Sequence, residues 1–232
     1  MKKIAIILAM FLAGCATQGS KDSLASSKTA AAEAYIDKGY THLSNRETQQ
    51  ALEYFDKAIY ECEGQYSNDK ETVYASRGPS ETLYYLTLAT TEKKNAIAVA
   101  PTCAYALYLK GFAILDLGKI DEAETYLKRA VDMAPMNSMF LSELGNVYHA
   151  KKDWNTALGI FILSEEAANL FSPDLMKERE LTRAMRGTGY SLIELGRLDE
   201  AEEKFKECLK INSDDEAAKQ ELHYIEQSRT DR

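Results

Sequence analysis

The sequence has few residues that interrupt a helix, with only 4 prolines and 12 glycines among its 232 residues. This scarcity disfavours an all-β chain rich in tight turns, and also a fibrous or disordered chain. Basic residues are in the minority too, because 28 Lys and Arg face 36 Asp and Glu, for a formal net charge of −8. Nucleic-acid binding needs clustered cations that displace counterions from phosphates. We therefore expect a mostly helical protein with no nucleic-acid partner.

Residues that commonly bind metals or carry out catalysis are also scarce. The three histidines, His42, His149 and His223, lie in distant regions, and none has a second ligand at metal-binding spacing. The sequence contains no serine-hydrolase elbow, no zinc-protease motif and no glycine loop for a phosphate. Four cysteines are too few for a disulfide scaffold. We expect no metal, no cofactor and no catalytic residues.

The one long apolar run, Ile4 to Leu12, is too short to span a bilayer, which takes about 18 residues or more. It follows the basic Met1-Lys2-Lys3, an order typical of a secretory signal. It ends in Leu12-Ala13-Gly14-Cys15, which resembles the lipobox of bacterial lipoproteins. The resemblance implies cleavage after Gly14 and acylation of Cys15, and several acyl chains give a stable anchor. The alternative is an ordinary signal peptide that a cysteine happens to follow.

The expected anchor divides the N-terminal region into two parts. Residues 1–14 are a signal peptide, and residues 15–29 are the lipidated cysteine and a flexible tether, since this stretch is rich in serine and has no apolar periodicity. In lipoproteins an Asp directly after the lipidated cysteine tends to retain the protein at the inner membrane, and here Ala16 stands at that position. The resemblance therefore implies an anchor in the outer membrane, with the protein facing the periplasm.

The remainder of the chain repeats a spacing of small and large residues. A glycine is followed twelve residues later by an alanine at Gly39/Ala51, Gly111/Ala123, Gly145/Ala157 and Gly189/Ala201. Four residues beyond each alanine stands a large apolar residue: Phe55, Leu127, Phe161 or Phe205. We interpret each unit as two antiparallel helices that cross closely where the glycine meets the alanine. Neither helix can bury its apolar stripe alone, so the units are expected to stack.

This pattern resembles the tetratricopeptide repeat, a unit of 34 residues that forms two helices. Counted from seven residues before each glycine, the repeats are 32–65, 104–137, 138–171 and 182–215. A degenerate fifth repeat is expected at 70–103, and a capping helix at 214–229. The resemblance implies an all-α, helix-turn-helix solenoid over 30–230.

Two features depart from the regular repeat. In 70–103, Gly78-Pro79 interrupts the expected first helix, which we expect to restart at Ser80 and to be followed by a second helix. Ten extra residues before 182 are expected to lengthen the first helix of the last repeat. Neighbouring units of a solenoid lie roughly 10 Å apart, which argues against a disulfide between Cys62 and Cys103. Cys208 takes a small-residue packing position and is expected to be a buried thiol.

The first helices of such repeats line a concave face, on which partners bind. Residues one and four after each glycine, and three and six before it, share one helical face. The candidate partner-binding residues on this face are Tyr40, Tyr105, Tyr108, Phe112, Asn146, His149, Arg183, Arg186 and Tyr190. The alternative is that some of these side chains pack between helices and do not face a partner. Arg183 and Arg186 are the less ambiguous pair, because charged side chains are rarely buried without a partner.

The sequence thus predicts a membrane-anchored interaction scaffold of the bacterial cell envelope, with no enzymatic activity, that binds a partner protein or peptide on its concave face. By resemblance, lipoproteins of this build serve as pilotins for pili, in outer-membrane protein assembly, or as adaptors for peptidoglycan enzymes. An immunity or regulatory lipoprotein that blocks an exported effector is the alternative, and an envelope hydrolase is a third. The sequence leaves the oligomeric state open.

Overall fold

The computed structural model describes residues 14–63 and 71–230, with side chains described from residue 27 onward. Two short strands and ten helices follow one another in these residues. The elements are α1 (Gly14–Ser44), α2 (Thr48–Glu63), β1 (Thr72–Ala75), α3 (Pro79–Thr91), β2 (Ala96–Val99), α4 (Thr102–Asp116), α5 (Ile120–Met133), α6 (Ser138–Ala150), α7 (Trp154–Phe171), α8 (Asp174–Glu194), α9 (Leu198–Ile211) and α10 (Glu216–Thr230).

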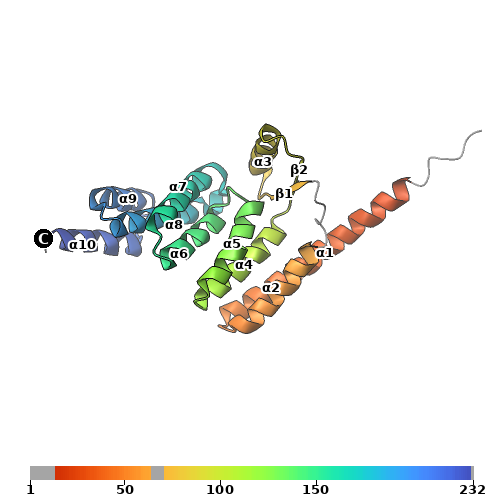
Figure 1. Cartoon of the computed structure of the whole chain (residues 1–232), viewed down its shortest axis with the longest axis horizontal. Helices are drawn as coiled ribbons and strands as arrows, with labels where there is room; N and C mark the ends of the chain where they lie inside the picture. The colour runs from red at the N-terminus through yellow and green to blue at the C-terminus, as the bar shows by residue number, and fades with distance from the viewer. Residues whose placement is uncertain (1–13, 64–70, 231–232) are drawn as a thin grey trace, which may run out of the picture.

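The helices form a one-dimensional stack, as expected for an all-α solenoid (Figure 1). Four antiparallel pairs, α1–α2, α4–α5, α6–α7 and α8–α9, follow each other along the axis, and α10 covers the last pair. The extra residues before 182 do lengthen α8, which runs for 21 residues against 13 in α6. Cys208 is a fully buried free thiol, as predicted.

The repeated glycines make room for large apolar side chains within each pair. A β-carbon added at Gly145 would lie 2.6 Å from the ring of Phe161, closer than side chains can approach. Gly39, Gly111 and Gly189 face Phe55, Leu127 and Phe205 in the same way. We expected each glycine to meet the alanine twelve residues later. In the structure it chiefly meets the large residue four positions beyond that alanine. All four large side chains are fully buried.

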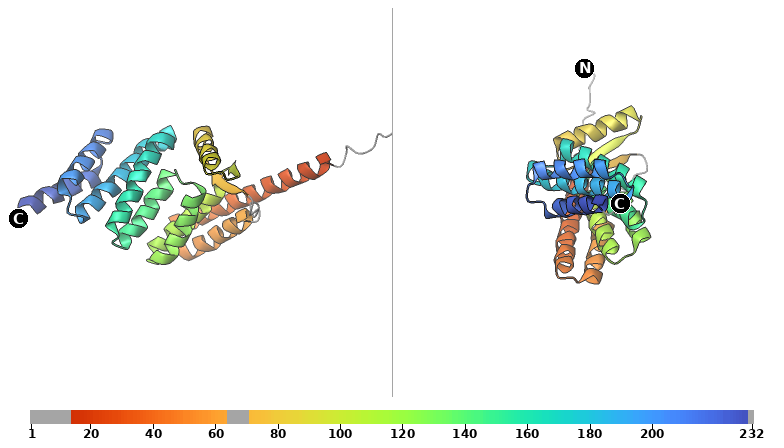
Figure 2. Two further views of the ribbon diagram at one scale, coloured as in Figure 1. Left: turned by 45° about the horizontal axis from the view of Figure 1, so that its top comes forward. Right: turned by 90° about the vertical axis from the view of Figure 1, so that its left-hand side faces the viewer.

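Residues 70–103 do not form the expected pair of helices. They hold a strand, a helix and a second strand, which we call the βαβ unit (residues 72–99), and β1 pairs in parallel with β2 from Thr72 opposite Ala96 to Ala75 opposite Val99. The helix restarts at Pro79, one residue before the predicted position, because proline suits the first turn of a helix. The predicted second helix is wrong, since its segment forms β2. In Figures 1 and 2 α3 stands at the side of the stack.

A buried polar network holds the βαβ unit against the last two helix pairs. The Arg77 guanidinium donates from Nη1 to both carboxylate oxygens of Glu180 on α8, each at 3.0 Å. Glu81 on α3 accepts the Arg77 backbone N–H and the Tyr85 hydroxyl, at 2.5 and 2.8 Å. The Ser172 hydroxyl also donates to Glu180. Both carboxylates are almost fully buried, so their contacts fix the position of the unit.

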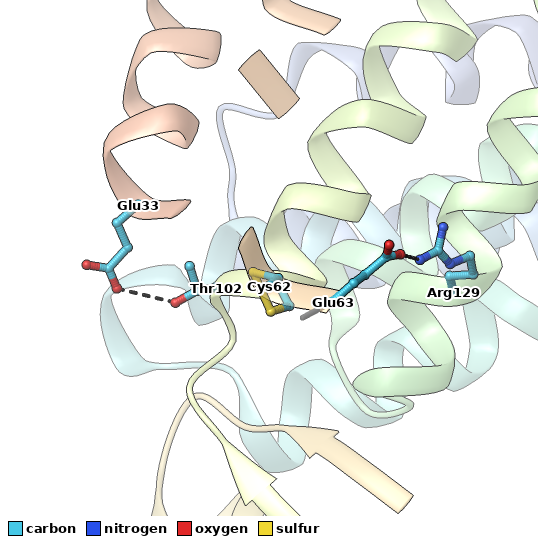
Figure 3. Close-up of a disulfide and its surroundings, with 6 residues drawn as sticks. Glu33, Cys62, Glu63, Thr102 and Arg129 are labelled. Atoms are coloured by element: carbon cyan, nitrogen blue, oxygen red, sulfur yellow. Dashed lines mark hydrogen bonds and ion pairs between the residues drawn. A yellow bond between two sulfur atoms is a disulfide. The ribbon is translucent and has the colours of Figure 1, made fainter. Parts of the chain in front are cut away.

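The expectation against a disulfide is also wrong, because Cys62 and Cys103 are bonded, with their Cα atoms 5.5 Å apart (Figure 3). The prediction placed a whole helix pair between them. In the structure the chain leaves the stack at the end of α2 and rejoins it at the start of α4, so that these two helices pack directly together. Beside the disulfide, Thr102 donates to Glu33, and Arg129 pairs with Glu63.

The predicted flexible tether differs from the structure as well, because α1 begins at Gly14 and includes residues 15–29. This segment has no proline to interrupt a helix, so the alanine-rich turns after residue 29 extend toward the N-terminus. The extension projects beyond α2 in Figures 1 and 2. Residues 1–13 of the predicted signal peptide, and the Cys15 side chain, lie outside the described part. Within that part, no helix is both long and apolar enough to cross a membrane.

Candidate functional site

The first helices of the four pairs enclose a groove with a volume of about 550 Å³. Its lining comes from α1, α4, α6 and α8, which is the face that the repeat pattern predicted to be concave. Six of the nine predicted residues line it: Tyr40, Tyr105, Tyr108, Phe112, Arg183 and Arg186. Leu43, Ser44, Leu109, Met139, Ser142, Arg179 and Glu180 complete the lining. The repeat pattern therefore located the groove, although a role for these residues in binding remains a prediction.

Aromatic rings from α4 form one wall of the groove. The Tyr108 ring stacks on Tyr105 and Phe140, with centroids 5.7 and 5.0 Å apart, and Phe112 lies 6.4 Å further along. Burial raises the pKa of Tyr108 to about 12, so its hydroxyl stays protonated at neutral pH. Tyr40, at the end of α1, is 56% exposed. The wall therefore combines rigid, partly buried rings with one accessible ring.

The opposite wall carries arginines from α8, and two of them already have partners. Arg183 pairs with Glu143 of α6, and Arg186 pairs with Asp215. Both carboxylates are buried. Burial works against ionisation of Asp215, but the Ala218 backbone N–H and Arg186 hold the pKa of this carboxyl below its ordinary value. Both arginines therefore complete ion pairs within the stack, and their role in binding a partner stays a prediction.

Arg179 is a groove residue that the repeat pattern missed. It lies in the turns of α8 that precede the regular repeat at 182, four residues before Arg183 and seven before Arg186. This spacing places all three arginines on one face of the helix. Arg179 itself is exposed. The same spacing rule, continued one turn toward the N-terminus, would have found it.

Asn146, His149 and Tyr190 do not line the groove. Asn146 lies beside Glu143, with the amide nitrogen 3.4 Å from a carboxylate oxygen. His149 packs among the rings of Trp154, Phe161 and Tyr190, with centroids 5.8, 4.8 and 5.0 Å away. The ring contacts support the alternative interpretation for His149 and Tyr190, in which these residues pack between helices. They stabilise the junction between α6, α7 and α8.

His149 also contacts a hydroxyl group, that of Ser191 on α8. His149 Nε2 lies 2.7 Å from the Ser191 hydroxyl oxygen, which also lies 2.8 Å from the Gly187 carbonyl oxygen. When Ser191 donates to Gly187, the imidazole donates to Ser191, and in the other tautomer Nε2 accepts the Ser191 proton instead. Burial lowers the pKa of His149 to about 4, so the ring is neutral at pH 7. No group of three or more metal-ligating side chains occurs among the described residues.

The family of the chain follows from its helix pairs and from sequence matches. Family models described as tetratricopeptide repeat match residues 32–63, 108–169 and 189–215, which together are just over half of the chain. The chain belongs to the tetratricopeptide repeat family. The matched ranges exclude β1, α3 and β2, in agreement with the departure of the βαβ unit from the repeat.

Solved structures share this fold at low sequence identity. The pilF protein of Pseudomonas aeruginosa is 16% identical, with a TM-score of 0.62 over 88% of this chain and 72% of that one. MamA of Desulfovibrio magneticus RS-1 is 17% identical, with a TM-score of 0.56 over 87% of this chain and 86% of that one. None of the curated proteins matches the sequence. At these identities the likeness concerns the fold alone.

Proposed function

We propose that the protein is a membrane-anchored interaction scaffold of the bacterial envelope, which binds a segment of a partner protein in the concave groove. The observation that carries this proposal is the groove itself, lined by the first helices of all four pairs with aromatic side chains facing arginines.

The groove suits a peptide in both size and chemistry. Its volume of about 550 Å³ is in the range of ligand sites in proteins, roughly 300–1,000 Å³. Tyr40 and Tyr105 offer ring faces with polar hydroxyls, which bind apolar side chains and main-chain groups of a peptide. The rings of Tyr105 and Tyr108 are already stacked on each other, so they lose little conformational entropy when a peptide binds.

Two features support a location outside the cytoplasm. The lipobox-like tetrad ending in Cys15 follows a signal-like apolar run. The Cys62–Cys103 disulfide is an independent feature, because disulfides persist in oxidising compartments and are rare in the cytosol. A lipid-anchored protein that faces the periplasm combines both, and Ala16 after the cysteine favours the outer membrane.

Affinity purification from detergent-solubilised envelopes tests the groove. Tyr40→Ala removes a groove ring, and Tyr60→Ala is a matched control, because Tyr60 is 78% exposed on α2 and does not line the groove. We expect a stoichiometric partner to co-purify with the wild-type protein and the Tyr60 variant and to be lost with Tyr40→Ala. A partner that binds all three equally would contradict the groove, and the absence of any partner would contradict the scaffold.

Membrane fractionation tests the anchor separately. Cys15→Ser removes the thiol that would carry the acyl chains, so the variant should be released in soluble form or accumulate unprocessed. Mass spectrometry of the wild-type N-terminus should show an acylated cysteine as the first residue. A fully processed Cys15→Ser variant that remains bound to the membrane would show that the lipid anchor is wrong.

A further inference from the structure

The outer surface of α7 differs from that of the other second helices. At three exposed positions of the repeat, α7 carries Gly159, Ile162 and Leu163, and the two apolar side chains are 53% and 37% exposed. The residues at the same positions are Glu53, Asp56 and Lys57 in α2, Thr125, Lys128 and Arg129 in α5, and Glu203, Lys206 and Glu207 in α9. Leu170, which is 57% exposed, continues the apolar stripe two turns further along α7. This face therefore resembles the buried side of an amphipathic helix, although nothing in the described chain covers it.

Gly159, in the middle of this stripe, has no role in packing within the described chain. A β-carbon added there would meet nothing within 4 Å, whereas the repeated glycines of the first helices each face a large side chain. A glycine inside a helix is less favourable than an alanine, so its presence here calls for another reason. The absence of a side chain lets a second backbone approach closely, and this suits a crossing point between two helices.

The charges that border the stripe complement each other when the stripe meets a copy of itself. Lys152 and Glu166 stand seven residues before and seven residues after Gly159. Both are exposed, and neither has an ion-pair partner among the described residues. Two α7 helices that cross in antiparallel orientation at Gly159 bring each Glu166 opposite Lys152 of the other copy. A parallel crossing would place the two glutamates against each other instead.

The antiparallel arrangement also keeps both N-termini on one side. The helices of the pairs run across the stack, the N-terminal extension of α1 projects from one end, and α10 lies at the other end (Figures 1 and 2). Antiparallel α7 helices are related by a twofold axis that runs along the stack, so both extensions leave the dimer at the same end. Two copies held in one membrane by the proposed anchor at Cys15 need this arrangement.

We propose that the outer face of α7 binds the same face of a second copy of this chain, in a symmetric dimer whose helices cross at Gly159. Ile162 and Leu163 of each copy pack over Gly159 of the other, because the side chains of a helix lean toward its N-terminus. Ion pairs between Glu166 and Lys152 border the contact on both sides.

The dimer leaves the proposed peptide-binding groove open in both copies. The groove is lined by α1, α4, α6 and α8, and α7 contributes none of its lining residues. The inference therefore goes beyond the proposed function and does not depend on it. A contact through one helix of each copy is small, so we expect a dimer of micromolar affinity, which a shared membrane would strengthen by raising the local concentration.

Sedimentation equilibrium of the full-length protein, in a detergent matched to the solvent density, measures the dimer. We expect a monomer–dimer equilibrium in the micromolar range, which Gly159→Gln should weaken about tenfold or more by holding the helices apart. The folded monomer should tolerate this change, because the added side chain meets open space and glutamine suits a helix. Thr125→Gln, at the same repeat position of α5, is the matched control and should dimerise as the wild type does. A protein that is still monomeric at about 100 μM, or a dimer that is indifferent to Gly159→Gln, would overturn the proposal.

Charge reversal shows whether the occupant of the face is a second copy. Lys152→Glu and Glu166→Lys each place two like-charged pairs across the dimer, so each variant alone should associate about tenfold more weakly. An equimolar mixture of the two variants should recover the affinity, since every facing pair is then of opposite charge. The two positions lie about 21 Å apart within one chain, so the recovery cannot arise inside a monomer. Association that does not recover on mixing would overturn the proposed contact. Tyr40→Ala should leave the dimer unchanged, so that a failure of the groove and a failure of the dimer are distinguishable.

Discussion

The four helix pairs and the βαβ unit are held in place by different kinds of contact. Each pair repeats one apolar arrangement, in which a glycine on the first helix faces a large buried side chain on the second. The βαβ unit occurs once. Its Tyr74 and Tyr85 join an apolar cluster with the stack, and its position also depends on the Arg77 network and on the disulfide at its base. The repeated contact is insensitive to pH and redox conditions, whereas the unit adds to its apolar cluster contacts that depend on charge and on oxidation.

The difference shows how the solenoid accommodates an insertion. The disulfide joins the two points at which the chain leaves and rejoins the stack, so α2 and α4 pack as neighbours in spite of the intervening residues. A two-stranded sheet has little stability of its own. The unit therefore depends on its contacts with the stack, which are an apolar cluster around Tyr85 and the polar contacts with α8, and in return it supports the end of α8 that carries Arg179.

The largest effect is expected in a helix pair. Phe161 is fully buried and fills the space between Gly145 and Gly187, so Phe161→Ala should lower the free energy of unfolding by about 4 kcal/mol. Urea denaturation followed by circular dichroism measures this loss. Leu163→Ala on the same helix is the control, because Leu163 is 37% exposed and should cost under about 1 kcal/mol. Equal losses for the two variants would contradict the packing described here.

A somewhat smaller effect is expected from the disulfide. The bond spans 41 residues, for which loop closure in the unfolded chain is worth about 3–4 kcal/mol. Reductant should therefore lower the urea midpoint of the wild-type protein and leave that of a Cys62→Ala/Cys103→Ala variant unchanged. A wild-type midpoint that does not respond to reductant would show that the bond is absent or without effect on stability.

The helix pairs could be predicted from the sequence, and the βαβ unit could not. The glycine and the large residue sixteen positions later belong to adjacent helices, so their contact recurs at a fixed spacing. Arg77 and Glu180 are far apart in the sequence, and no local pattern connects them. The same holds for Cys62 and Cys103, whose distance depends on whether the intervening residues remain in the stack. Residues 96–99 stand where a regular repeat has its second helix, but parallel pairing with β1 makes them a strand.

The network of the βαβ unit provides the next test. Arg77→Met leaves the buried Glu180 and Glu81 without their cation and should cost about 3 kcal/mol. Hydrogen exchange should show the loss in β1 and β2, with little change in α6 and α9. Adding Glu180→Gln removes one buried charge, so the double variant should be less unstable than the two single changes combined. A uniform loss of protection over all helix pairs would contradict a local role.

The groove was only partly predictable, for a similar reason. Helix periodicity places Tyr105 and Tyr108 on the concave face of one repeat and Arg183 on that of another. The structure brings all three together in the groove. Whether an arginine is available to a partner depends on carboxylates from other helices. Glu143 and Asp215 pair with Arg183 and Arg186, and this information is tertiary.

Acid provides a test that is confined to the helix pairs. Burial lowers the pKa of His149 to about 4 in the folded protein, against about 6.5 in an unfolded chain. Below pH 6.5 the unfolded chain takes up a proton that the buried ring does not. The free energy of unfolding should therefore fall by about 2 kcal/mol as the pH falls from 6.5 toward 4. His149→Gln should reduce the difference in urea midpoint between pH 7 and pH 4.5. The exposed His223→Gln should keep it, and an equal reduction by both variants would contradict the assignment.

The smallest effect concerns a feature that the helix pairs and the βαβ unit share. Gly118 and Gly196 end α4 and α8 with φ of 74° and 73°, and Lys152 and Lys93 adopt similar angles after α6 and α3. A side chain is strained in this left-handed conformation, so Lys152→Gly and Lys93→Gly should each stabilise the protein by about 0.5 kcal/mol. Lys210→Gly, within α9, should destabilise it instead. Thermal unfolding measures all three, and equal signs at Lys152 and Lys93 would mean that α3 ends in the same way as the helices of the repeats.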